Sequence, residues 1–84
     1  MDSVFKALAD PNRRKIITML KKRSMTVSDI QKSFPFSGAT LSYHLDALKS
    51  ADLVVTERRG QFIVYSLNTS VFEEVLTAFY SFFS

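Results

Sequence analysis

The sequence of 84 residues contains no cysteine, one histidine, two glycines and two prolines. The lack of cysteine excludes disulfide bonds, thiolate catalysis and thiolate metal sites. A single histidine excludes a metal site built from several histidines of one chain, and two glycines cannot form a glycine-rich phosphate loop. The low glycine and proline content, together with 46% hydrophobic residues, excludes a disordered or collagen-like chain and predicts a packed globule.

Basic residues are absent from the C-terminal part of the chain. All eleven lysines and arginines occur at or before Arg59, and residues 60–84 carry only Glu73 and Glu74 as charged side chains. Five aromatic residues fall between Phe72 and Phe83. The basic body, in a chain of net charge +3, suggests a polyanionic partner. The apolar tail suggests a buried or shared face.

The length predicts a single domain that spans residues 1–84. So short a chain buries only about 60–65% of its unfolded surface and usually needs a disulfide, a metal or a partner subunit. With disulfides and thiolate or multi-histidine metal sites excluded, a partner subunit is the remaining source of stability. The sequence shows no signal peptide and no membrane-length apolar run, so we expect a cytoplasmic protein.

Two helices are predicted in the first 22 residues. The apolar residues between 3 and 9 mark a short first helix. Asp10 and Pro11 predict the start of a second helix that runs to about Lys22, because aspartate caps a helix and proline fits its first position. Its apolar face points inward. The basic residues that we expect to point away from that face are Arg13, Arg14 and Lys21.

Two further helices are predicted between residues 26 and 50. Thr26 and Asp29 have the spacing of a capping box, which opens a third helix of about eight residues that ends before Phe34 and Pro35. Ser37 caps a fourth helix that runs from residue 38 to about 50. The inward face of this fourth helix consists of Leu41, Leu45 and Leu48.

The hydrophobic period then changes to that of strands. Residues 53–59 and 62–67 are rich in β-branched and aromatic side chains, and Gly60-Gln61 lies between them, which predicts a two-stranded hairpin. Thr69 or Ser70 is expected to cap a last helix over residues 70–83, with Ser70 and Glu73 forming a capping box. The predicted order is α-α-α-α-β-β-α, mainly α with a small β-hairpin.

This order predicts a winged helix-turn-helix fold. A two-stranded hairpin is not stable alone, so it must pack on the helices with its turn projecting as a wing. The outward face of the fourth predicted helix is short, polar and hydrogen-bonding, as a helix that reads base edges requires. A solvated face is the alternative interpretation, and Asp46 on this face counts against DNA. The candidate base contacts are Ser37, Ala39, Thr40, Ser42 and Tyr43.

Arg58 and Arg59 at the predicted wing can reach phosphate or a minor groove, with Gln61 beside them. Charged residues also protect edge strands from pairing, so these arginines have a structural explanation too. We interpret His44 as a packing residue rather than a ligand. The sequence contains no carboxylate pair or Ser-His-Asp set, so we expect no enzyme activity and no cofactor.

The apolar stripes at the two ends of the chain either complete the protein's own core or pair with a second copy. We favour a homodimer, held by terminal helices 3–9 and 70–83, because no other source of stability is available. The candidate interface residues are Val4, Phe5, Leu8, Phe72, Val75, Leu76, Phe79, Phe82 and Phe83.

The chain resembles the ArsR/SmtB family of winged-helix repressors over about residues 4–83. The resemblance rests on the run Phe5-Lys6-Ala7-Leu8-Ala9-Asp10-Pro11-Asn12-Arg13-Arg14, on Ser42-Tyr43-His44-Leu45, Leu48 and Leu53-Val54, and on Arg58-Arg59-Gly60-Gln61 and Tyr65-Ser66-Leu67. The hairpin is most similar to that of the SdpR-like autorepressor branch. The resemblance implies a homodimeric repressor that uses its first and last helices to dimerise, binds an inverted-repeat operator and controls its own operon.

Departures from the family pattern argue against metal sensing. Thr26 and Ser28 stand where metal-sensing relatives carry thiolates, and the last predicted helix has no histidine. Tyr43 stands where many relatives have a histidine, so the operator sequence does not follow from the resemblance. By analogy with the SdpR-like branch, a protein partner relieves repression. A winged-helix module that binds only proteins is the alternative function, whereas Glu73 and Glu74 disfavour a membrane-surface helix.

Overall fold

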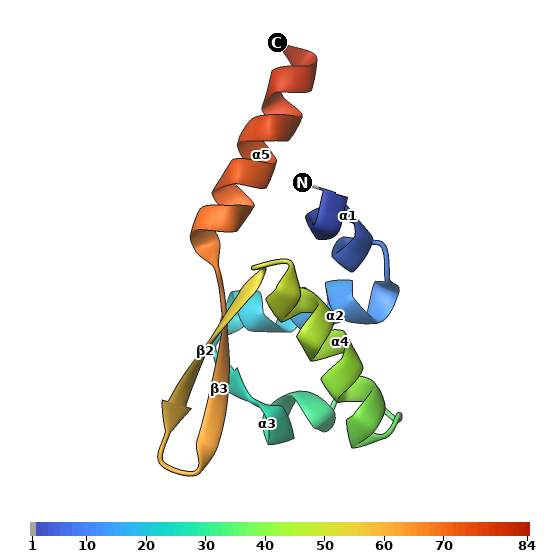
Figure 1. Ribbon diagram of the computed structural model, residues 1–84, viewed down its shortest axis with the longest axis vertical. Helices are drawn as coiled ribbons and strands as arrows, with labels where there is room; N and C mark the ends of the chain where they lie inside the picture. Colours follow the sequence, from blue (N-terminus) through green and yellow to red (C-terminus); the bar gives the residue numbers. More distant parts are fainter. Residues whose placement is uncertain (1) are drawn as a thin grey trace.

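Five helices and three short strands follow one another in residues 2–84, the part of the chain that the computed structural model describes. Their order is α1 (Asp2–Leu8), α2 (Pro11–Lys22), β1 (Met25–Thr26), α3 (Val27–Gln31), α4 (Gly38–Ser50), β2 (Val54–Arg59), β3 (Phe62–Leu67) and α5 (Thr69–Phe83). Figure 1 shows a body made of α2, α3, α4 and the sheet, from which α5 projects beside α1. This mainly helical architecture confirms the predicted winged helix-turn-helix.

Helix α2 begins where the sequence predicts. The Asp10 carboxylate accepts hydrogen bonds from the backbone N–H groups of Asn12, at 2.8 Å, and Arg13, at 3.2 Å, and Pro11 occupies the first turn. Desolvation alone would raise the pKa of Asp10, but these two amides, together with the nearby charge of Arg13, hold it below its ordinary value of 3.8.

Helix α3 is shorter than predicted. The capping box is confirmed, because Thr26 Oγ1 accepts from the Asp29 N–H at 3.2 Å and the Asp29 carboxylate accepts from the Thr26 N–H at 3.3 Å. The helix nevertheless has five residues rather than eight. Beyond Gln31, the N–H groups of Ser33 and Phe34 bond to carbonyls three residues back, which tightens the chain into a turn ahead of Pro35.

The predicted hairpin is confirmed as β2 and β3, which form the wing, and a third strand that the sequence does not predict extends it to an antiparallel sheet of order β1-β3-β2. Strands β2 and β3 pair from Val54↔Leu67 to Arg59↔Phe62, and Gly60 at the turn has a φ of 62°. The additional strand β1 pairs Met25 with the middle of β3. Two residues are too few to show a period, so only the pairing reveals this strand.

The C-terminus of α4 places the sheet on the helices. The N–H of Leu53 bonds to the Leu48 carbonyl and that of Asp52 to the Lys49 carbonyl, both at 3.0 Å, which is a Schellman motif. Asp52 has a φ of 59° at the position where glycine is usual. Leu48 and Leu53 are both fully buried, so the motif joins α4 to β2 through the core.

The core lies between α2, α3, α4 and the inner face of the sheet. Its fully buried side chains are Ile16, Ile30, Leu41, Leu45, Leu48 and Leu53, which confirms the predicted leucine face of α4. Helix α5 buries only Val75. The predicted caps of α5 are wrong, because Asn68 is its N-cap residue and makes no side-chain cap bond. The entry to this helix is held instead by the Asn68 N–H, which donates to the Leu53 carbonyl at 3.0 Å.

Candidate nucleic-acid interface

The turn between α3 and α4 presents the N-terminus of α4 to solvent. Ser37 Oγ accepts from the Thr40 N–H at 3.2 Å and so caps α4 as predicted. The five candidate base contacts, which are Ser37, Ala39, Thr40, Ser42 and Tyr43, are all exposed. Tyr43 exposes 64% of its surface. The helix therefore offers a small, polar face on a backbone that its leucines anchor in the core.

Three contacts that sequence analysis missed hold the α3–α4 turn. Gln31 Nε2 donates to the Phe36 carbonyl at 2.8 Å, and Lys15 Nζ donates to the Ser33 carbonyl at 2.9 Å. The rings of Phe34 and Phe36 stack at 4.9 Å. The sequence shows Phe34 and Phe36 on either side of Pro35. The two polar contacts have no signal in the sequence, because one depends on the geometry of the turn and the other on the packing of α2 beside it.

His44 is a packing residue, as predicted. It is 5% exposed, and its Nδ1 accepts a hydrogen bond from Arg13 Nε at 3.2 Å. This contact corrects the expectation that Arg13 points away from the protein. Arg13 instead turns back onto α4, where its guanidinium also lies 5.4 Å from the centre of the Tyr43 ring. Arg14 does point away and donates to the carbonyls that end α1.

The wing residues are exposed at the same end of the molecule as the α3–α4 turn (Figure 1). Arg58 Nε donates to the Gly60 carbonyl at 3.2 Å, and Arg59 Nη2 pairs with Glu57 at 3.2 Å. Both contacts are solvent-exposed and therefore cost little to break. The two arginines, with Gln61 beside them, are available for an anionic ligand.

The opposite end of the molecule is apolar. Phe5 of α1 meets Phe79 of α5 edge-to-face, with ring centres 5.7 Å apart. Val4 and Val75, which the sequence pattern assigns to an interface, are each 6% exposed and belong to the subunit's own core. Leu8 and Phe72 are half-buried. The large exposed side chains at this end are Phe5, Leu76, Phe79, Tyr80, Phe82 and Phe83, all of which except Tyr80 are candidate interface residues from the sequence.

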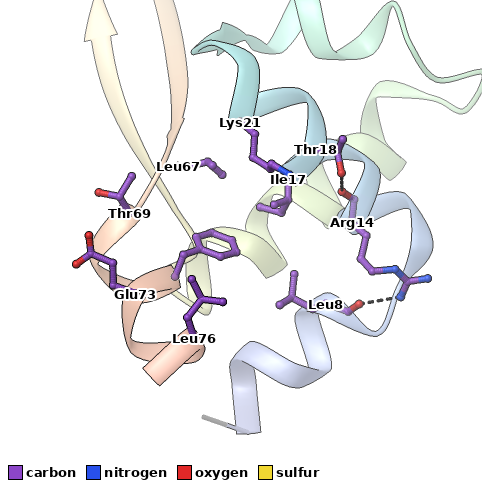
Figure 2. A pocket seen from close by; sticks show the side chains of 10 residues that line it. Leu8, Arg14, Ile17, Thr18, Lys21, Leu67, Thr69, Glu73 and Leu76 are labelled. Atoms are coloured by element: carbon purple, nitrogen blue, oxygen red, sulfur yellow. Dashed lines mark hydrogen bonds between the residues drawn. The ribbon is translucent and has the colours of Figure 1, made fainter. Parts of the chain in front are cut away.

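An apolar pocket of about 580 Å³ opens where α5 leaves the body. Figure 2 shows Leu8, Ile17, Leu67 and Leu76 around it, from α1, α2, β3 and α5. In residues 2–84 no group of three or more potential metal ligands is found, and no helix is long and apolar enough to span a membrane.

Comparisons with known proteins agree with this geometry. A family described as a helix-turn-helix domain matches residues 8–57, which run from α1 into the wing. The transcriptional repressor SdpR of Bacillus subtilis is 49% identical over 74 residues, covering 88% of this chain and 82% of that protein. The arsenical resistance operon repressor of Staphylococcus xylosus is 34% identical, over 81% of this chain and 65% of its own length. A solved structure of an ArsR-like transcriptional regulator from a Rhodococcus species superimposes with a TM-score of 0.87 at 27% identity, over 96% of this chain and 76% of that one.

The chain belongs to the ArsR family of winged helix-turn-helix transcriptional repressors. The homologues and the fold are those of DNA-binding regulators and not of enzymes. Within the ArsR fold, α4 is the second helix of the helix-turn-helix, and β2 and β3 form the wing.

Proposed function

We propose that this ArsR-family repressor binds an inverted-repeat operator as a homodimer, controls its own operon and does not sense metal ions. The observation that carries the proposal is the division of the molecule into two ends. A polar helix face and the wing arginines share one end, and the uncovered apolar side chains of α1 and α5 occupy the other.

The DNA contacts are assigned by exposure and chemistry. Small side chains and hydroxyls at the start of α4 allow close approach to base edges in a major groove, and the free N–H groups of its first turn favour phosphate. Arg58 and Arg59 contact the backbone or the adjacent minor groove, with Gln61 at the tip of the wing. The full set of proposed contacts is Ser37, Ala39, Thr40, Ser42, Tyr43, Arg58, Arg59 and Gln61.

The homodimer is assigned by what α5 leaves uncovered. Five large side chains of α5 are between 47% and 86% exposed. Burial of each such side chain contributes about 1.5–3 kcal/mol, so two copies together offset an association cost of roughly 4–15 kcal/mol. A second copy also places two α4 helices on successive major grooves, about 34 Å apart. The proposed interface is Phe5, Leu8, Phe72, Leu76, Phe79, Tyr80, Phe82 and Phe83.

Metal independence is inferred from the ligands available. The chain has no cysteine, and its single histidine is buried with Nδ1 already bonded to Arg13. The hydroxyls of Thr26 and Ser28 are poor ligands for zinc or copper. We expect operator affinity to be unchanged by micromolar zinc, copper or nickel and by a chelator. A reversible, stoichiometric metal effect on operator affinity would contradict this part of the proposal.

Salt-dependent DNA binding tests the repressor function. Three to five phosphate contacts per subunit predict a log–log salt slope of roughly −5 to −9 for the dimer. Arg58→Ala and Arg59→Ala should weaken binding to every duplex and flatten the slope, whereas Tyr43→Ala should reduce only the preference for the cognate duplex. Binding to no duplex at low salt would favour the protein-interaction alternative.

Sedimentation of Phe82→Glu tests the dimer. Phe82 is 81% exposed, so the substitution removes an interface contact without opening the core, and we expect a monomer with lost operator binding. Thr77→Glu is the matched control, because it introduces the same charge on the polar side of the same helix. A dimer in both variants, or a folded monomer in the unaltered protein at micromolar concentration, would refute the proposed interface.

A further inference from the structure

The Arg13 side chain connects α2 to α1 and to α4, the helix that we propose reads DNA. Arg13 is half-buried, and its Nε donates to His44 Nδ1 at 3.2 Å. Its Nη1 lies 3.5 Å from the Lys6 carbonyl oxygen of α1, and its guanidinium carbon lies 5.4 Å from the centre of the Tyr43 ring. One planar group therefore contacts a buried residue and an exposed residue of α4 at once.

The geometry restricts the Tyr43 side chain. The ring centres of Tyr43 and His44 lie 5.5 Å apart, and His44 is in turn 5.5 Å from Phe36 in the α3–α4 turn. The guanidinium lies against the tyrosine ring, which is a favourable cation–π arrangement. The hydrogen bond to buried His44 restrains the guanidinium, and the guanidinium in turn limits the directions that the exposed Tyr43 ring can take.

We propose that Arg13 is a positioning residue for operator recognition. Held by His44, the Arg13 guanidinium sets the orientation of Tyr43 and so contributes to discrimination between base sequences, without contacting DNA itself. This inference rests on the proposed function, in which Tyr43 contacts bases. The contribution is to specificity, because a preoriented side chain does not pay the entropy of ordering when it meets its base.

Arginine and lysine are not equivalent in this role. Lysine keeps the positive charge but lacks the Nε–H that reaches His44 and the planar guanidinium that lies over the Tyr43 ring. Arg13→Lys therefore removes the contacts that orient Tyr43 while it keeps the positive charge at position 13. Arg14→Lys is the matched control, because Arg14 is the next residue of α2 and donates to the Leu8 and Ala9 carbonyls, at 2.8 and 2.9 Å, rather than to α4.

The experiment compares two duplexes. The first is enriched from a random-sequence pool by the unaltered protein, and the second is a scrambled duplex of the same composition. We expect Arg13→Lys to lower the ratio of the two affinities about tenfold, the size of one lost base contact, with the scrambled-duplex affinity and the salt slope unchanged. Arg14→Lys should leave the ratio unchanged.

A double-mutant cycle guards against a purely structural effect. If Arg13 acts through Tyr43, Arg13→Lys should produce no further loss of discrimination in a Tyr43→Ala protein. His44→Asn, which keeps an acceptor near the position of Nδ1, should retain more discrimination than His44→Phe. In the unaltered protein, the Arg13 Nε–H should give a slowly exchanging NMR signal coupled to an unprotonated Nδ1 of His44, a test that needs no variant to fold.

The results that overturn the inference are distinct from those that overturn the proposed function. A pool that yields no enriched duplex refutes DNA reading, and this inference with it. If a duplex is enriched and the Arg13→Lys variant distinguishes it from the scrambled duplex as well as the unaltered protein does, only the role of Arg13 is refuted. A uniform loss on both duplexes with a shallower salt slope would show that Arg13 contacts phosphate directly, which also refutes positioning.

Discussion

Helices α4 and α5 have similar lengths, 13 and 15 residues, but opposite relations to the core. The three leucines on the inward face of α4 are at most 2% exposed, whereas Leu76 of α5 is 66% exposed and Phe83 is 86% exposed. Helix α4 is covered by the rest of the subunit on its apolar side and presents polar groups to solvent. Helix α5 differs, because most of its large apolar residues are exposed to solvent together with its polar ones.

The difference fits the two roles that we propose for these helices. The role proposed for α4, which is to read DNA, requires a helix that is held rigidly. The buried leucines of α4, the Ser37 cap and the Schellman motif provide that support. The role proposed for α5, which is to join two copies, requires apolar surface that its own subunit leaves uncovered. The more apolar of the two helices is therefore the less buried one in the isolated chain.

The largest expected difference between the two helices is the cost of removing a leucine. Leu45→Ala should lower the free energy of unfolding by about 2–5 kcal/mol, because it opens a cavity in the core. Leu76→Ala should change it by no more than about 0.5 kcal/mol in the Phe82→Glu background, which we expect to be monomeric, because the side chain is already exposed. Urea unfolding of both variants measures the two values, and equal costs would mean that α5 packs on its own subunit.

The N-cap residues of α4 and α5 should also differ in their contribution to stability. Ser37→Ala should destabilise the DNA-free protein by about 1 kcal/mol, because it removes the cap that accepts from the Thr40 N–H. Asn68→Ala should cost less than about 0.5 kcal/mol, because Asn68 makes no side-chain cap bond. Thermal unfolding of the two variants decides the matter, and a comparable loss at both positions would contradict the difference in capping.

A stabilising substitution is expected at the end of α4. Asp52 has a φ of 59°, a conformation that glycine adopts without strain. Asp52→Gly should raise the free energy of unfolding by about 0.5–1 kcal/mol, while Lys49→Gly, inside the helix, should lower it by about the same amount. Chemical denaturation of both proteins provides the comparison. A loss of stability in Asp52→Gly would show that the aspartate side chain contributes more than its backbone strain costs.

The smallest expected effect is the pH dependence that comes from the aspartates capping α2 and α3. Hydrogen bonds to Thr26 lower the pKa of Asp29, and the backbone amides of Arg13 and Asn12, opposed by desolvation, lower that of Asp10. Because both folded-state values lie below the ordinary 3.8, this stabilisation is present above pH 3.8 and is lost as the pH falls through the folded-state values. Urea midpoints measured as the pH is lowered should fall less steeply in Asp10→Asn. An identical slope in that variant would assign the acid sensitivity to other groups.

Local signals in the sequence were sufficient for most of the fold. The bounds of α2 and α4, the capping box of α3 and the Gly60 turn follow from interactions between residues a few positions apart, so composition and spacing predict them. The exposure of all eight candidate DNA contacts also agrees with the helical period and the position of the turn. Whether those residues bind the operator stays a prediction.

Other features were decided only by the tertiary structure. Strand β1 exists because Met25 lies opposite Tyr65, forty residues away, and a two-residue strand carries no periodic signal. Arg13 turns inward because the fold brings His44 within reach of its side chain. Val4 and Val75 belong to the core although their helical stripes continue into exposed phenylalanines. A sequence shows which face of a helix is apolar, but the share of that face covered by the subunit depends on where the other elements pack.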